Sequence, residues 1–215
     1  MEANSRKVVS NQAGCHQDLD KIVLKHKQSK FLKPVAEHSI DAFEQIITAI
    51  QFHNLPVIFD ACCGVGDSTR NLAKQNPNYF VVGVDKSDFR LSKNRQENPD
   101  NMILVRSDLN DFYRLAAQHN FKAEQHKIYF PNPWPKSNHI GRRWHGAPVF
   151  SDLVKLSENI EVRSNWRIYL EEFQIALNHY GLASQIVEFK VENPITPFEK
   201  KYSNSGQQIF QLKTV

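Results

Sequence analysis

Between residues 36 and 130, short apolar runs alternate with amphipathic or polar stretches. The apolar runs are rich in Val, Ile and Phe, and they predict strands over residues 57–59, 79–84, 102–105 and 128–130. Helical spacing and capping residues predict helices over residues 36–53, 67–75, 87–95 and 109–118. Strands that alternate with helices favour a mostly parallel sheet that is covered on both faces.

The C-terminal third of the chain changes this pattern. It predicts a strand over residues 167–170, followed by a helix that ends near Tyr180. Two further β-like runs, 184–191 and 207–212, are close enough in sequence to form an antiparallel pair. The order therefore predicts an α/β fold: a doubly wound, mostly parallel sheet with an antiparallel hairpin at its C-terminal edge.

The length of 215 residues suits one domain. Residues 1–33 are polar and basic, and we expect a flexible segment there and a single domain over residues 34–215. No apolar run approaches the roughly 20 residues of a membrane helix, and the N-terminus lacks the apolar region of a signal peptide. Three cysteines do not form a disulfide framework. These features predict a cytoplasmic protein with no membrane association.

Charge is distributed unevenly along the chain. The 27 Lys and Arg residues outnumber the 23 acidic residues by only four, a weak net field. However, residues 21–33 carry five lysines without an acid, and residues 132–151 carry further basic residues without an acid. A solvated surface explains the first stretch as well as a function does. Two such stretches favour a polyanionic partner.

A glycine-containing loop follows the first predicted strand. Gly64 and Gly66 allow a sharp turn and a close approach of the backbone to a ligand. The next helix would present its N-terminal N–H groups to that ligand. Asp85 ends the second predicted strand, 19 residues after Gly66, where a carboxylate can bind a ribose diol. This spacing predicts a cofactor of the nucleoside type.

The acids around this loop favour S-adenosylmethionine as the cofactor. Thr69 stands where a dinucleotide fingerprint has its third glycine, and Asp60 before the loop would repel a pyrophosphate but attract an ammonium group. Asp108, after the third strand, is placed to bind an adenine amino group. The ordered set resembles the motifs of class I methyltransferases: Asp60, Gly64, Gly66, Asp85 and Asp108.

A proline-rich loop, Phe130-Pro131-Asn132-Pro133-Trp134-Pro135-Lys136, follows the fourth predicted strand. Its prolines stiffen the carboxyl edge of the sheet, where ligands bind in such folds. Trp134 offers a flat surface on which a base can stack. Filling the edge of the core is an equally good interpretation of this tryptophan.

The loop and its continuation to Arg143 resemble the signature F-P-D-P-W-x-K-x-x-H-x-x-R-R of bacterial tRNA (guanine-N7)-methyltransferases. Thr196-Pro197-Phe198-Glu199 resembles the T-x-F-E motif of that family, and residues 206–212 resemble its last strand. The resemblance spans about residues 55–213. It implies a Rossmann-like class I methyltransferase domain and methyl transfer from S-adenosylmethionine to N7 of a guanine in tRNA.

The same resemblance implies roles for individual residues. Asp60, Asp85 and Asp108 would contact the cofactor. Substrate contacts would come from Lys136, Glu172, Thr196 and Glu199, and contacts to tRNA phosphates from Arg142 and Arg143. The chain departs from the family pattern at Asp60, Cys62 and Glu172, where the family has Glu, Gly and Asp.

We expect no bound metal ion, because the histidines and cysteines lack the spacing of metal ligands. The sequence leaves a monomer and a homodimer equally open.

The family pattern also has Asp where this chain has Asn132. Guanine N7 has an in-plane lone pair and no proton, so its methylation needs no general base. A carboxylate would stabilise the cation that develops on the purine. An amide keeps the hydrogen bonding but loses the charge, at a cost of about 1–3 kcal/mol. We expect Asn132 to be the catalytic residue and to orient the base.

Three other functions remain open. Asn-Pro-Trp also resembles the (N/D)-P-P-(Y/F/W) loop of methyltransferases that act on exocyclic amines of RNA or protein, where the Asn oxygen accepts the N–H bonds of the attacking nitrogen. A catalytically weakened relative that binds RNA without methyl transfer is another hypothesis. A dehydrogenase is disfavoured, because Thr69 replaces the third glycine of the fingerprint.

Overall fold

The computed structural model describes residues 5–93 and 96–215. The described residues form one sheet of seven strands in the order β3-β2-β1-β4-β5-β7-β6. The strands are β1 (Val57–Ala61), β2 (Phe80–Asp85), β3 (Met102–Arg106), β4 (Gln125–Tyr129), β5 (Ile160–Ser164), β6 (Ser184–Glu188) and β7 (Phe210–Thr214). The order reverses between β1 and β4, which is where ligands bind in open α/β sheets.

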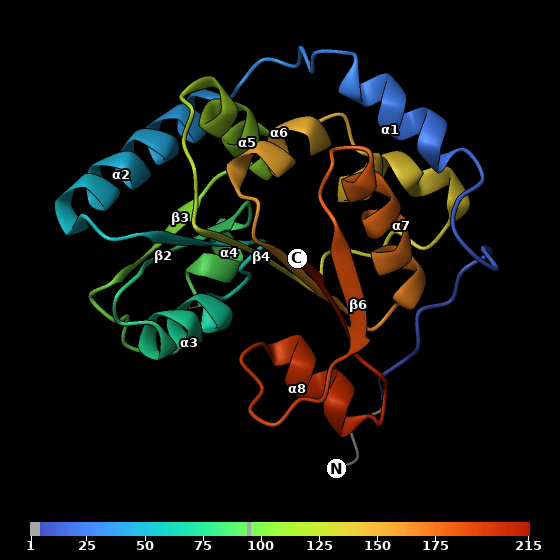
Figure 1. Ribbon diagram of the computed structural model, residues 1–215. Helices are drawn as coiled ribbons and strands as arrows, with labels where there is room; N and C mark the ends of the chain where they lie inside the picture. The colour runs from blue at the N-terminus through green and yellow to red at the C-terminus, as the bar shows by residue number, and fades with distance from the viewer. Residues whose placement is uncertain (1–4, 94–95) are drawn as a thin grey trace.

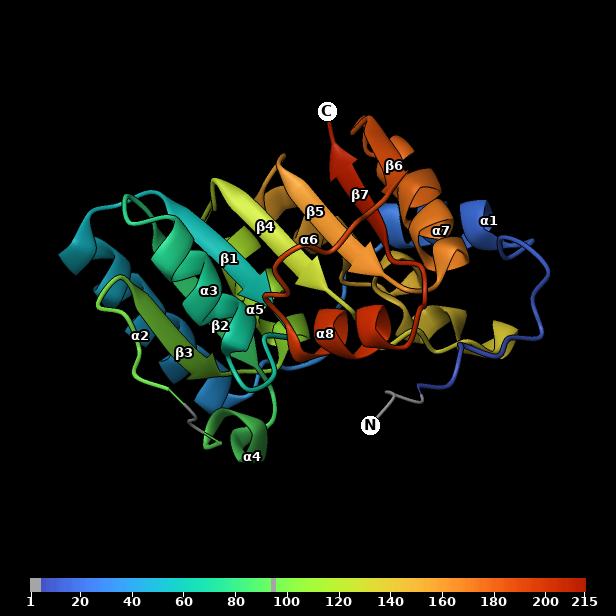
Figure 2. The ribbon, with the colours of Figure 1, turned by 90° about the horizontal axis from the view of Figure 1, so that it is seen from below.

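The strands β1 to β5 are parallel, and β7 is antiparallel to both of its neighbours, β5 and β6. Figure 2 shows β1, β4 and β5 pointing one way and β7 pointing back. The predicted fold class is therefore confirmed, and so is the antiparallel pairing of the last two strands.

Helices cover both faces of the sheet. They are α1 (Leu19–Lys27), α2 (Glu37–His53), α3 (Asp67–Gln75), α4 (Asp88–Leu91), α5 (Leu109–Gln118), α6 (Phe150–Leu156), α7 (Arg167–Asn178) and α8 (Pro197–Asn204), with 3-10 turns at Ser137–Arg142 and Trp144–Gly146. Figure 1 shows α2, α5 and α6 on one side of the sheet and α3 and α8 on the other. No helix in the described part of the chain is long and apolar enough to cross a membrane.

The prediction of a strand over residues 167–170 is wrong, because this run forms the first turn of α7. Its apolar residues continue at helical spacing through Phe173 and Leu177, both fully buried. The strand in this region is β5, which the sequence analysis missed because Glu161 and Arg163 interrupt its apolar residues. Both are paired inside the protein, with their side chains 2.6 Å apart.

The helix predicted over residues 87–95 is shorter in the structure, where it is α4, and residues 94–95 lie outside the described residues.

The largest apolar cluster lies between the sheet and the helices α2, α5 and α7. Phe59 of β1 stacks on Phe112 of α5, with ring centroids 4.4 Å apart. Leu19 and Val23 of α1 are buried in the same cluster. Residues before position 33 thus contribute to the common core, and the division of the chain at residue 33 stays a prediction.

Gly83 of β2 gives a direct test of this packing. A Cβ atom there would lie 2.4 Å from Oγ1 of Thr69 and 2.7 Å from Cδ2 of Leu104. We expect Gly83→Ala to lower the free energy of unfolding by about 2 kcal/mol, because these neighbours must move. At Gly14 a Cβ would meet nothing within 4 Å, so Gly14→Ala is the control. Equal urea midpoints for the two variants would contradict this packing.

Candidate active site

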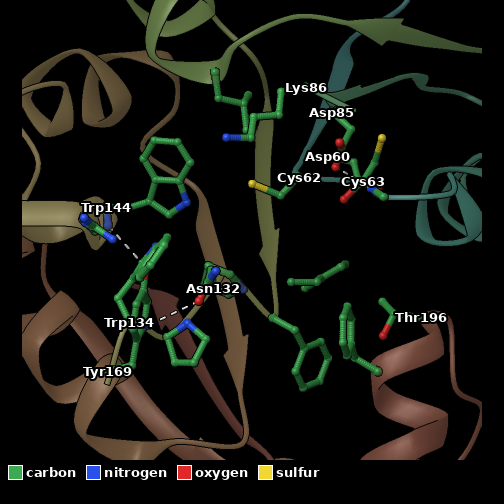
Figure 3. Close-up of a pocket in the computed structure, with 18 of the residues that line it drawn as sticks. Asp60, Cys62, Cys63, Asp85, Lys86, Asn132, Trp134, Trp144, Tyr169 and Thr196 are labelled. Carbon is green, nitrogen blue, oxygen red and sulfur yellow. Dashed lines mark hydrogen bonds between the residues drawn. The ribbon is translucent and has the colours of Figure 1, made fainter. Parts of the chain in front are cut away.

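A large pocket opens at the carboxyl ends of β1, β2 and β4, with a volume of about 910 Å³. Its lining includes predicted residues from both motif groups, namely Asp60, Gly64, Asp85, Asp108, Asn132, Trp134, Arg142 and Thr196. Figure 3 shows Asp60 and Asp85 on one side of this pocket and Trp134 and Trp144 on the other. The fold therefore brings together residues that are far apart in the sequence.

The loop after β1 has a left-handed backbone at three positions, with φ of 59° at Cys62, 61° at Gly64 and 81° at Gly66. Gly66 is also needed for packing, because a Cβ there would lie 2.6 Å from Cδ1 of Leu104. A Cβ at Gly64 would meet nothing within 4 Å, so this loop leaves open space in the pocket. Gly66 therefore allows the loop to pack closely against Leu104, and Gly64 faces the space that a ligand would fill.

Asp60 is a buried carboxylate, and the described residues form hydrogen bonds to only one of its two oxygens. Its Oδ2 accepts hydrogen bonds from Ser68 Oγ at 2.6 Å and Thr69 Oγ1 at 2.7 Å. Among the described residues, its Oδ1 has no hydrogen-bond partner. Burial raises the pKa of Asp60 to about 6, although the two hydroxyls oppose the shift. A buried acceptor without a partner is costly, so this atom fits a cationic or donor group of a ligand.

Asp85 and Asp108 are partly engaged by the backbone. Asp85 Oδ1 accepts from the Ser87 amide at 2.8 Å and pairs with Arg90 at 2.8 Å. Within the described part of the chain, its Oδ2 accepts only the Gly64 amide, at 3.0 Å. Asp108 caps α5 through the Asn110 amide at 2.9 Å. Both carboxylates line the pocket and retain acceptor capacity on one oxygen.

The proline-rich loop carries the predicted catalytic residue on a strained backbone. Phe130 and Trp134 have positive φ, of 49° and 42°. Asn132 is exposed, and its Oδ1 accepts from the Trp134 amide at 3.3 Å. The guanidinium of Arg142 lies 4.7 Å from the centre of the Trp134 ring, in a cation–π arrangement. One face of the indole is thus covered, and residues in such strained conformations persist where the surroundings fix them.

The structure does not bring Arg143 into the pocket, and its predicted contact with tRNA phosphates does not fit this geometry. The side chain is fully buried. It donates hydrogen bonds to the carbonyl oxygens of Trp134 and Lys136 and to side-chain oxygens of Gln12 and Glu172. Arg143 therefore fixes the loop, whereas the adjacent Arg142 is exposed.

Glu172 and Glu199 also lie outside the pocket lining. Burial alone would raise the pKa of Glu172, but hydrogen bonds from His145 and Arg143 lower it to about 2. Glu199 Oε2 accepts from the amide of Ile195 at 2.7 Å, and its Oε1 accepts from Arg163 at 2.6 Å. Direct substrate contact does not fit either carboxylate in this structure, because its oxygens are occupied by the protein.

The two remaining predicted substrate residues differ in position. Thr196 lines the pocket, and its hydroxyl accepts from the Glu199 amide at 2.9 Å, so it caps α8. Lys136 is exposed at the end of the loop and does not line the pocket. His145 is buried against Glu172, and the described residues contain no group of His, Cys and acids that could hold a metal ion.

An aromatic group in the pocket was missed by the sequence analysis. Phe198 and Tyr202 of α8 stack with ring centroids 5.9 Å apart, and Phe130 lies 5.5 Å from Tyr202. Phe198 is 45% exposed although it is apolar. The signal was present in the spacing: a Thr-Pro-Phe-Glu helix start followed by Tyr four residues after Phe198 places both rings on one helical face.

The strand order, the glycine loop after β1 and the acids at the strand ends define the fold of a class I methyltransferase. Residues 54–212 match the family model Methyltransf_4, described as "Putative methyltransferase". The chain belongs to this methyltransferase family.

Curated relatives carry a more specific name. The chain is 29% identical over 187 residues to a "tRNA (guanine-N(7)-)-methyltransferase" of Lysinibacillus sphaericus (strain C3-41), with 75% of this chain and 81% of that protein covered. A protein of the same name from Streptococcus pneumoniae (strain CGSP14) is 29% identical over 177 residues, which covers 74% and 80% of the two chains.

Solved structures support the fold. An antibiotic-related methyltransferase has a TM-score of 0.58 at 15% identity, over 89% of this chain and 98% of that one. A variant of the 16S rRNA (adenine(1408)-N(1))-methyltransferase from Catenulisporales acidiphilia, solved with its cosubstrate S-adenosylmethionine, has a TM-score of 0.56 at 16% identity, over 80% and 90%.

The left-handed backbone at Cys62 predicts a gain on substitution by glycine. A non-glycine residue in this region costs about 1–2 kcal/mol. We expect Cys62→Gly to be about 1 kcal/mol more stable than Cys62→Ala, since both lose the thiol and only alanine keeps the strain. Chemical denaturation compares them. Equal stability would show that the loop relaxes around the alanine.

Asp60 predicts a pH-dependent stability difference. Its folded pKa of about 6 exceeds the ordinary value of 3.8, so its contribution favours folding below pH 4 and is lost as the pH rises through 6. Asp60→Asn removes the buried charge. When the pH is raised from 4.5 to 7.5, we expect the free energy of unfolding of the variant to increase by about 2 kcal/mol relative to that of the wild type. Urea unfolding at both pH values measures it, and an unchanged difference would contradict the raised pKa.

Proposed function

We propose that this methyltransferase transfers the methyl group of S-adenosylmethionine to N7 of a guanine in tRNA. The observation that carries the proposal is the pocket itself, where the half-satisfied carboxylate of Asp60 and the exposed amide of Asn132 line one cavity. The family and the names of the curated relatives support the same reaction. A tRNA substrate also agrees with the predicted cytoplasmic location.

The residues around the glycine loop fit S-adenosylmethionine. When bound, this cofactor supplies an electrophilic methyl group on a sulfonium. Asp60 Oδ1 would hold the ammonium of its amino-acid end, because that oxygen is buried without a partner. Asp85 Oδ2 would accept from the ribose and Asp108 from the adenine amino group, each with spare acceptor capacity. The open space over Gly64 leaves room for this molecule.

Asn132 would orient the target base through its side-chain amide. Its Oδ1 accepts a long hydrogen bond from the Trp134 N–H, which leaves Nδ2 as the free donor. No described residue accepts a hydrogen bond from this Nδ2. The O6 atom beside N7 of guanine is an acceptor, and N7 carries no proton to remove. Catalysis by this chain therefore rests on positioning, without a general base.

An exocyclic amine is the alternative acceptor. That chemistry requires the Asn oxygen to accept N–H bonds from the attacking nitrogen. The Asn132 oxygen accepts one bond from the Trp134 backbone at 3.3 Å and keeps a second lone pair, so the methylated nucleoside has to separate the two acceptors. The aromatic rings of Phe198 and Tyr202, with Trp134 across the loop, would provide the stacking surface for the purine.

The tRNA backbone would lie along the exposed basic residues. Arg142 is exposed in the pocket lining and Lys136 is exposed outside it. Lys21, Lys25 and Lys30 are exposed on or after α1. Affinity that depends on such contacts falls steeply with salt.

The reaction is tested with labelled S-adenosylmethionine and unmodified tRNA, followed by digestion to nucleosides. We expect the label in 7-methylguanosine. Label in an exocyclically methylated nucleoside would replace this proposal with the amine alternative. Binding of tRNA without any label would identify a non-catalytic RNA-binding relative.

Restoring the family carboxylate at position 132 gives a sharper prediction. Asp can keep the hydrogen bond from the Trp134 amide and add a negative charge beside the purine, which becomes cationic during transfer. We expect Asn132→Asp to raise the single-turnover rate about tenfold, or about 1.4 kcal/mol, and Asn132→Ala to lower it. A slower Asp variant with unchanged tRNA affinity would show that the free amide donor matters more than charge.

A further inference from the structure

The N-terminal segment, defined here as residues 5–16, runs from beside α8 to the start of α1 and is bonded to the substrate side of the pocket along its length. Figure 1 shows this dark blue segment along one edge of the molecule. At its start, the Ser5 carbonyl accepts from Gln207 Nε2 at 2.8 Å. Apart from bonds within the segment and to the start of α1, the hydrogen bonds that follow go to the proline-rich loop, to Ser137 directly after it, or to the residues that hold it.

Ser10 and Asn11 bind the end of that loop directly. Ser10 Oγ donates to the carbonyl oxygen of Pro135 at 2.6 Å. Asn11 makes two bonds to Ser137: its Oδ1 accepts from the Ser137 amide at 2.9 Å, and its Nδ2 donates to the Ser137 hydroxyl at 3.1 Å. These bonds join positions more than 120 residues apart in the chain.

Gln12 completes the environment of the buried arginine. Its Oε1 accepts from Arg143 Nη2 at 2.5 Å, and its Nε2 donates to Glu172 Oε1 at 2.9 Å. The amide of His16 donates to the same Glu172 oxygen at 2.9 Å. Because Arg143 donates to the Trp134 carbonyl at 3.0 Å, Gln12 is one side chain away from the backbone that carries Asn132 and Trp134.

We propose that Ser10 and Gln12 are positioning residues for methyl transfer, which hold the proline-rich loop in the conformation that presents Asn132 and Trp134 to the base. The inference rests on the proposed function. The loop needs such support, because Trp134 has a left-handed φ of 42° and Asn132 is exposed with one weak hydrogen bond of its own. Neither Ser10 nor Gln12 lines the pocket, so both act through the loop.

The experiment uses the full chain with four substitutions. Ser10→Ala and Gln12→Ala remove the bonds, and Ser10→Thr keeps the hydroxyl. Gln17→Ala is the control, because Gln17 is exposed in the same region and makes no hydrogen bond to a described residue. For each protein we would measure the affinity for S-adenosylmethionine by calorimetry, the affinity for unmodified tRNA, and the single-turnover methylation rate at saturating tRNA.

We expect Ser10→Ala and Gln12→Ala to lower the single-turnover rate about tenfold or more, because misplacing a reacting group by about 1 Å is this costly. Both affinities should change less than about threefold, and Ser10→Thr and Gln17→Ala should keep the wild-type rate. Wild-type rates in both alanine variants, or a loss confined to tRNA affinity, would overturn the proposal and leave the proposed function intact.

A second measurement separates the two proposals. Hydrogen exchange of the peptide that contains residues 131–137 should be faster in both alanine variants than in Gln17→Ala. If wild type methylates no guanine, the proposed function fails, but this measurement still decides whether the segment holds the loop. Unchanged exchange would overturn that role for Ser10 and Gln12.

Discussion

The buried ion pair between Arg143 and Glu172 organises the side of this molecule that carries the proline-rich loop. Both side chains are fully buried, with Nη1 and Oε2 2.5 Å apart. Removing one partner of such a pair costs about 3–5 kcal/mol, because the other charge stays buried without compensation. The pair draws three separate parts of the chain together: the N-terminal segment through Gln12, the loop through the Trp134 carbonyl, and α7 through Glu172 itself.

This pair contrasts with the carboxylate of Asp60 at the end of β1. Glu172 has four donors from the protein and a pKa of about 2, whereas Asp60 has two hydroxyl donors and a pKa that burial raises to about 6. A protein that buries a charge without full compensation gives up stability. The acid outside the pocket lining is thus satisfied by the fold, whereas the acid in the lining keeps one oxygen without a partner among the described residues. Perturbed groups of the second kind mark functional sites.

The sequence predicted the sheet as far as its signals are local. The helix over residues 67–75 and the strands that flank it were predicted correctly, because glycine, capping residues and apolar runs act within a few positions. The strand β5 was missed because Glu161 and Arg163 resemble surface residues until their distant partners are known, Lys127 on β4 and Glu199 on α8. A short-range pattern does not contain those partners.

The same reason explains which parts of the site were predicted. The motif residues that line the pocket, such as Asp60 and Asn132, belong to loops at the ends of strands, and topology alone brings them together. Adjacent residues of one motif were not separable in this way. Arg142 and Arg143 are neighbours in sequence, but one lies over the Trp134 ring and the other is buried beneath the loop. The direction of Arg143 depends on Glu172 and Gln12, which are distant in the chain.

Buried charges also connect the sheet to the aromatic wall of the pocket. Glu161 of β5 accepts from Lys127 at 3.0 Å and from Arg163 at 2.6 Å, and the other end of the Arg163 guanidinium reaches Glu199 at 2.6 Å. Glu199 forms the capping box that starts α8 with Thr196. The helix carrying Phe198 and Tyr202 is thereby oriented by a charge network rooted in the sheet, and its short, exposed length needs this support. Rings that stay partly exposed gain little from burial themselves, so the helix that carries them must be held from behind.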